Sequence, residues 1–266
     1  MQRKKFYIGV DCEGVSCVVG RPGGSLSDSE NFAWAQKQAT AEANAAATAL
    51  FDMGAEEVIV WDNHHSGVNL HYDELDSRCS ILLGSGHRGR FPTIDESFGG
   101  VLFIGYHSRD NVREAALAHT YSSLSYQYYK INGKEVGEME IDAAFAGLVN
   151  VPVIFASSDD KCIAQAKESF PWVETVVTKQ SLSWNSVISK HPKTVCREIY
   201  DGVKQAAARL EEMQSYTFAE PLNVEIRYKR LDAADSAKLF DRNGERFGFR
   251  DAYTRVGTVR TIRNLF

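Results

Sequence analysis

Four short hydrophobic runs in this chain each lead into residues that can bind a metal or carry a charge. Such runs, separated by helical patterns, are typical of parallel strands that are buried on both faces. In open α/β sheets, ligands bind in the crevice at the carboxyl ends of the strands. We therefore expect the residues that follow the runs to meet at one edge of a sheet. The runs are 5–10 before Asp11 and Glu13, 57–61 before Asp62 and His64, 101–106 before His107, and 151–156 before Asp159.

The side chains at these positions suit a divalent metal. Asp11 and Glu13 are two residues apart on extended chain, so their carboxylates share one face, and Gly14 allows a sharp turn after them. That pair alone fits a solvated loop better than a metal site. If the strands are neighbours, however, His64 and His107 join the carboxylates, and two histidines with two carboxylates suit zinc or a similar ion.

The order of the elements predicts an α/β fold. A helix over 31–53 follows the first strand, a hairpin over 126–136 turns at Asn132-Gly133, and a further helix runs over 138–149. We expect a mostly parallel sheet flanked by helices over residues 1–182. After residue 182 the hydrophobic pattern changes from continuous runs to a long helix and alternating strands, and we expect a smaller α+β domain at 183–266.

Composition narrows the class of protein. The net charge of -5 argues against nucleic acid as a partner, and Arg88-Gly89-Arg90 is interpreted as a solvated loop. No apolar run reaches the roughly 18 residues of a membrane span, and the run after the basic residues 1–5 is too short for a signal peptide. We therefore expect a cytoplasmic protein that does not associate with membranes. Five scattered cysteines without CxxC spacing argue against disulfides and structural zinc, and Cys12 is expected in the core.

The sequence leaves the roles of two histidines and one aspartate undecided. His65 faces away from His64 on extended chain, so only one of the two is expected to reach a metal. Asp62 fits either a partner for a histidine ring nitrogen or the cap of a turn. His119 follows a small apolar run, and a buried structural histidine and a catalytic acid/base explain it equally well.

Acidic residues also open two helices. Glu138, Glu140 and Asp142 lie in one first turn, where the helix dipole favours carboxylates, and this explains at least two of the three. Asp159 is interpreted as a helix cap.

Several motifs occur in a consistent order and spacing over residues 6–182. They include Val10-Asp11-Cys12-Glu13-Gly14, Trp61-Asp62-Asn63-His64, Gly105-Tyr106-His107, Ala118-His119-Thr120 and Gly133-Lys134-Glu135-Val136-Gly137-Glu138. This set resembles the motifs of the DppA-type zinc D-aminopeptidases, peptidase family M55. Two features depart from the family pattern: Gly9 stands where the motif has Ser, and the segment between His107 and His119 is one residue longer.

The resemblance implies a centre of two zinc ions per chain, and it matches His119 to the family's catalytic histidine. Asp11 would bridge both ions. The remaining ligands would be Glu13 and His107 at one ion, and His64 and Glu138 at the other. The family also implies a homo-oligomer, a decamer with D5 symmetry.

These observations predict a metal-dependent aminopeptidase or amidohydrolase. It would remove N-terminal residues, small or D-configured, from short peptides or amides, and a free acid among Glu138, Glu140 and Asp142 would pair with the substrate ammonium. A di-metal phosphoesterase is the first alternative, although Arg109 is the one basic residue near the strand ends. A non-catalytic, metal-stabilised assembly protein is the second, although five ligands exceed the four of a structural zinc.

Overall fold

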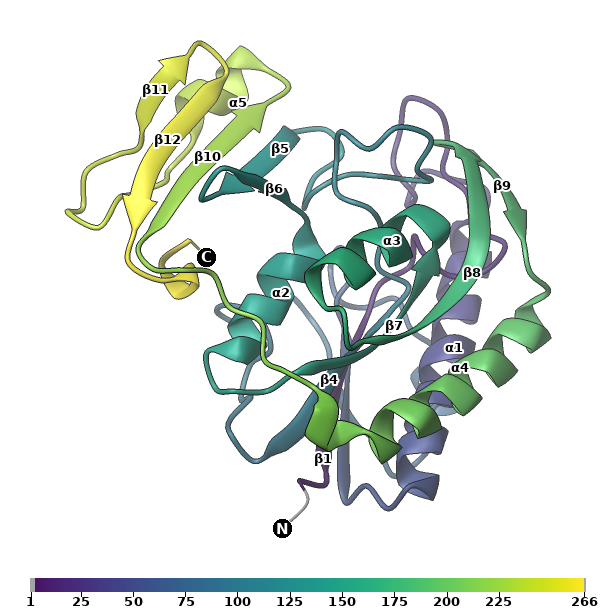
Figure 1. The fold of residues 1–266 in the computed structure, drawn as a ribbon. Helices are drawn as coiled ribbons and strands as arrows, with labels where there is room; N and C mark the ends of the chain where they lie inside the picture. The colour runs from purple at the N-terminus through teal and green to yellow at the C-terminus, as the bar shows by residue number, and fades with distance from the viewer. Residues whose placement is uncertain (1–2, 266) are drawn as a thin grey trace.

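Parallel strands form the centre of the structure (Figure 1). The computed structural model describes residues 3–265, and seven strands of that range form one sheet in which only the last pairs antiparallel. The four hydrophobic runs are neighbours, as predicted: β1 lies between β2 and β4, and β7 follows β4. In sheet order the strands are β3 (Ser80–Leu82), β2 (Glu57–Asp62), β1 (Lys5–Val10), β4 (Phe98–Ile104), β7 (Val153–Asp159), β8 (Glu174–Ser183) and β9 (Ser186–Ser189).

Helices cover both faces of this sheet, which confirms the predicted α/β class. On one face α1 lies beside α4, and its alanines allow the two helices to approach closely. On the other face lie α2 and α3. No helix within residues 3–265 combines the length and the apolar character needed to cross a bilayer. The helices are α1 (Phe32–Asp52), α2 (Glu138–Gly147), α3 (Asp160–Ser169) and α4 (Pro192–Ala208), with 3₁₀ turns at Tyr72–Glu74, Leu210–Glu212 and Ile262–Asn264.

A second, antiparallel sheet packs against α2. Because α2 lies between the two sheets, all of its residues are buried. The division at residue 182 stays a prediction; β9 and α4 pack on the large sheet, and the early hairpin β5–β6 belongs to the small one. In sheet order its strands are β11 (Gly248–Asp251), β12 (Thr254–Val259), β10 (Leu222–Tyr228), β5 (Tyr126–Ile131) and β6 (Lys134–Val136), and α5 (Leu231–Ser236) follows β10.

The turn after β1 and the turn after β4 touch each other through their backbones. Gly14 N donates to Gly105 O at 2.7 Å. Gly105 has a φ of +71°, and a Cβ at that position would lie 2.2 Å from Asp11 O. A Cβ at Gly14 would lie 1.9 Å from a backbone oxygen of the facing turn. Glycine is therefore required at both positions, and this contact brings Asp11 beside His107.

We predict that Gly105→Ala lowers the free energy of unfolding by about 3 kcal/mol, from backbone strain plus crowding against Asp11. Gly54→Ala is the matched control, because Gly54 also has a positive φ, +88°, but has nothing within 4 Å of the added Cβ. That control should cost only about 1 kcal/mol. Urea unfolding of both variants measures the difference, and equal losses would show that the contact between the turns is not crowded.

Candidate metal centre

The six site residues predicted from the sequence all line one cavity of about 360 Å³. They come from segments far apart in the chain: the turn after β1, the ends of β2 and β4, the loop that follows β4, and the start of α2. The parallel sheet brings these segments to one edge. The six are Asp11, Glu13, His64, His107, His119 and Glu138.

Two short contacts bring imidazoles against carboxylates. His64 Nε2 lies 3.1 Å from Glu13 Oε1, and His107 Nε2 lies 3.1 Å from Glu138 Oε1 and 3.4 Å from Asp11 Oδ2. The ligand atoms of Asp11, Glu13 and His107 all lie within 4.8 Å of one another. These nearest pairs differ from the pairs that the resemblance implies, and the division of ligands between two ions stays a prediction.

The ring nitrogens of His107 and His119 are oriented by backbone carbonyls. His107 Nδ1 donates to Ser108 O at 3.0 Å, and His119 Nδ1 donates to Leu117 O at 2.7 Å. A carbonyl only accepts, so in each neutral ring the proton sits on Nδ1 and the lone pair on Nε2. His119 stacks on His107 with ring centroids 3.8 Å apart, and its Nε2 lies 3.9 Å from Glu138 Oε1.

Asp62 and Asn69 fix the third histidine. Asp62 accepts from Asn69 N, Asn69 Nδ2 and Leu70 N, so it caps the turn after β2, one of its two predicted roles. Because Asn69 donates through Nδ2, its Oδ1 faces His64 Nδ1 at 3.4 Å. His64 is buried and His65 is exposed, as expected of adjacent residues. The sequence analysis missed Asn69, although its place seven residues after Asp62 fits a turn.

Burial and like charge dominate the electrostatics of the centre. Burial, and then repulsion from Glu13, raise the pKa of Asp11. Burial alone would lower the pKa values of His64 and His107, but the neighbouring carboxylates raise both to about 10. Burial and the adjacent His107 lower the pKa of His119. Three carboxylates thus compete for the positive charge of two imidazoles.

The donor set fits divalent zinc. Glu13 Oε2 is buried and has no hydrogen-bond partner among the described residues. In their neutral forms, His64 and His107 direct Nε2 lone pairs at carboxylate oxygens, and a cation between these atoms turns repulsion into attraction. Imidazole nitrogens with carboxylate oxygens are ligands that zinc accepts.

Arg90 corrects two expectations. Its loop was interpreted as solvated, which suits the exposed Arg88, but Arg90 turns inward and binds both oxygens of Asp142 at 2.6 and 2.9 Å. Arg90, rather than Arg109, is also the basic residue that lines the cavity. Its loop lies 52 residues before its partner, and no local pattern signals such a long-range pair.

The start of α2 also corrects the prediction that one of its three acids is free to bind a substrate ammonium. Glu140 accepts from Gly137 N at 2.9 Å and from Ser169 Oγ at 3.1 Å, while Asp142 is engaged by Arg90 and by Tyr106 Oη. Neither carboxylate lines the cavity. Only Glu138 of the three faces it, where Tyr121 N donates to Oε1 at 2.7 Å.

The side chain of Tyr106 fills the space next to Gly9. A Cβ added to Gly9 would lie 2.7 Å from Tyr106 Oη. That hydroxyl cannot move freely, because it donates to Asp142 Oδ2 at 2.6 Å and accepts from Asn63 Nδ2 at 3.0 Å. The phenol of Tyr106 therefore occupies the volume that a side chain at position 9 would need.

A buried lysine holds the loop that carries Glu13. Lys179 Nζ donates to the backbone oxygens of Glu13, Val15 and Val18. On the same loop, Glu42 accepts from Ser16 N at 2.9 Å and from Ser16 Oγ at 2.8 Å. The sequence analysis missed Lys179, since a single lysine in a strand gives no signal of its burial.

We predict that Lys179→Met weakens zinc binding about 10- to 100-fold, the usual effect of losing a group that supports a ligand. It also leaves three buried carbonyls without their donor, which should lower stability. Lys161→Met is the control, because Lys161 makes only a half-exposed pair with Asp160, away from the metal cavity, and such pairs contribute little. Competition with a zinc chelator measures the affinity, and equal affinities in the two variants would contradict the role of Lys179.

The fold and the site together define an α/β protein with a candidate metal centre at the carboxyl ends of parallel strands. The M55 peptidase family model, described as D-aminopeptidase, matches residues 4–261. The chain therefore belongs to the M55 peptidase family, as the resemblance of its motifs predicts.

Individual relatives agree with this placement. A D-aminopeptidase of Bacillus subtilis (strain 168) is 28% identical over 238 residues, which cover 88% of this chain and 85% of the relative. The solved structure of the Zn-dependent D-aminopeptidase DppA from Bacillus subtilis, described as a self-compartmentalizing protease, superposes with a TM-score of 0.88 at 25% identity. The superposition covers 98% of this chain and 93% of that one.

Proposed function

We propose that this chain is a zinc-dependent aminopeptidase that holds two zinc ions and acts on short peptides or amino-acid amides. The observation that carries the proposal is the meeting of three carboxylates with the imidazoles of His64, His107 and His119 in one cavity of an M55 family member. The ligands would be Asp11, Glu13, His64, His107 and Glu138, and Asp11 would serve both ions.

In this proposal His119 is the general acid/base of the reaction. When bound, the zinc ions activate a water molecule and polarise the scissile carbonyl. With its Nδ1–H donated to Leu117 O, His119 presents Nε2 to the cavity, where it accepts a proton and returns it to the leaving amine. Its lowered pKa keeps the neutral, proton-accepting form available near neutral pH.

The cavity lining suits a small N-terminal residue. Its acidic residues, Asp11, Glu13 and Glu138, are the proposed zinc ligands, and Glu140 and Asp142 are engaged elsewhere, so none of these carboxylates is left to pair with a substrate ammonium. A free amino group would instead offer its lone pair to a zinc ion. Its apolar lining gives a place for a short side chain and consists of Leu26, Leu117, Leu124 and Trp184. The proposal includes a D-configured N-terminal residue, because the family is described as D-aminopeptidase.

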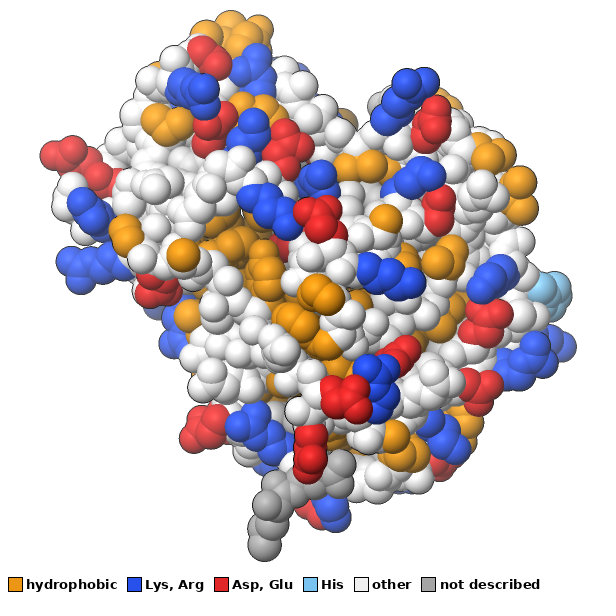
Figure 2. Space-filling model, viewed as in Figure 1, with side chains coloured by type: hydrophobic (Ala, Val, Ile, Leu, Met, Phe, Trp, Pro, Cys, Tyr) orange, Lys and Arg blue, Asp and Glu red, His pale blue; other side chains and the backbone are white. Residues whose placement is uncertain are grey.

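The proposal includes assembly into a homo-oligomer, with a decamer as the specific form. The described relative compartmentalises itself, and large apolar side chains are exposed on the small sheet and its loops. On the face shown in Figure 2, further apolar side chains gather along the furrow between this sheet and α2. Such surfaces are typical of protein contacts. The exposed residues are Leu231, Phe240, Phe249 and Tyr253.

We predict that the zinc-loaded protein releases alanine from D-alanine amide and from D-alanyl peptides, and that acetylation of the amine abolishes turnover. The reason is that a free amine can offer its nitrogen lone pair to zinc and be held in place, whereas an acetylated nitrogen cannot. A panel of D- and L-alanine amides, their acetylated forms and nitrophenyl phosphate measures this. Equal turnover of blocked and free amines would indicate a broader amidase, and turnover of the phosphate alone would indicate a phosphoesterase.

We predict that His119→Ala retains zinc and the fold but loses about 10²- to 10⁴-fold in kcat, the usual contribution of an acid/base group. His71→Ala is the control, because His71 is exposed and pairs with Glu74 outside the cavity. Elemental analysis accompanies the kinetics. Loss of zinc in His119→Ala would make His119 a ligand, which its place beside His107 and Glu138 allows, and full activity would contradict both roles.

A further inference from the structure

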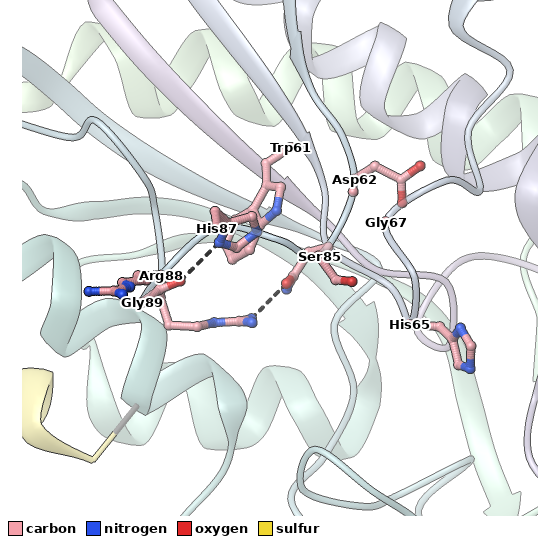
Figure 3. Close-up of a pocket in the computed structure, with 11 residues that line it drawn as sticks. Trp61, Asp62, His65, Gly67, Ser85, His87, Arg88 and Gly89 are labelled. Carbon is pink, nitrogen blue, oxygen red and sulfur yellow. Dashed lines mark hydrogen bonds between the residues drawn. The ribbon is translucent and has the colours of Figure 1, made fainter.

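A second hollow of about 570 Å³ adjoins the metal cavity (Figure 3). The two share Asn63, His65 and Arg90 in their linings, so these side chains form the boundary between the metal cavity and the hollow. Its remaining lining comes from the end of β2, from Gly67 in the turn that follows, and from the loop 84–89. In Figure 3, Trp61 and His87 lie together, and Arg88 extends away from them.

Arg90 is held rigidly at the boundary between the two hollows. Its guanidinium lies 4.5 Å from the centroid of the Trp61 ring. Its Nε and Nη2 bind Asp142, and Nη2 also donates to Asn63 Oδ1 at 2.7 Å. Nη1 makes no hydrogen bond to any residue that the structure describes. A guanidinium fixed on an aromatic ring with one nitrogen free is a pre-organised donor for a carboxylate.

The charges of the second hollow favour an anion. Among the residues that the structure describes, Asp62 is the only acid in its lining, and both of its oxygens already accept hydrogen bonds, from Asn69, Leu70 and Tyr72. The backbone amides of residues 85–90 donate to no other described residue, so the loop offers further donors.

We propose that this hollow is a subsite for the terminal carboxylate of a short peptide, bound on the leaving-group side of the scissile bond by Arg90 Nη1. The inference rests on the proposed aminopeptidase function. A short peptide with its amino end at the metal centre would extend its carboxyl terminus past the bond that is cut, toward the neighbouring hollow and Arg90. The site therefore favours di- and tripeptides with a free carboxyl terminus over amidated ones.

The test compares D-alanylglycylglycine with its carboxyl-terminal amide as substrates of the zinc-loaded protein. We expect kcat/KM to be about tenfold higher for the free acid, mainly through KM, as for one charge-assisted hydrogen bond. In the double variant Arg90→Met/Asp142→Asn, which leaves no unpaired buried charge, the ratio should fall to about one. Arg78→Met is the matched control, since Arg78 also pairs with a carboxylate and covers an aromatic ring, outside both cavities, and its ratio should stay at the wild-type value.

Calorimetric binding of glycylglycine and glycylglycinamide gives the same comparison for a variant that has lost turnover. A wild-type ratio near one, or an undiminished preference for the acid in the Arg90 double variant, overturns the subsite. Hydrolysis of neither peptide by the wild type would instead contradict the aminopeptidase function, and the subsite with it.

Discussion

Asp11, Glu13 and Glu138 place three carboxylates in one buried cavity, and such a group stays ionised only beside compensating positive charge. Two imidazoles face the carboxylates, yet their Nε2 atoms are also the natural ligand atoms of a metal. A zinc ion bound here would resolve this competition, because zinc attracts carboxylates and neutral imidazoles together. The rest of the site follows from holding these groups in place against their mutual repulsion.

Several supports share that task. The glycines at 14 and 105 let the first ligand-bearing turn pack against the third, and Lys179 fixes the carbonyls of the loop that carries Glu13. Glu138 begins α2, where the helix dipole favours a carboxylate, and the two sheets that enclose this helix give it a fixed position. Backbone carbonyls and Asn69 orient the histidine rings. Arg90 bridges this centre to the neighbouring hollow and neutralises Asp142.

Much of this arrangement could be predicted from local patterns. The hydrophobic runs gave the central strands, and the hairpin at 126–136 and the start of α2 lie where the turn and capping residues indicated. Boundaries were less accurate: β4 begins at Phe98 and β7 extends to Asp159, because pairing with neighbours continues beyond the apolar runs. Arg90, Asn69 and Lys179 were missed because each acts through a partner that only the folded chain brings near. The volume taken by Tyr106 beside Gly9 is likewise visible only in three dimensions.

The most direct test of the two-zinc proposal is anomalous X-ray diffraction from crystals of the zinc-loaded protein, measured on both sides of the zinc absorption edge. Two anomalous peaks per chain are expected, both within coordination distance of Asp11, with Glu13, His64, His107 and Glu138 completing the two sites. A single peak per chain at full occupancy, or two peaks that do not share Asp11, would contradict the proposed centre.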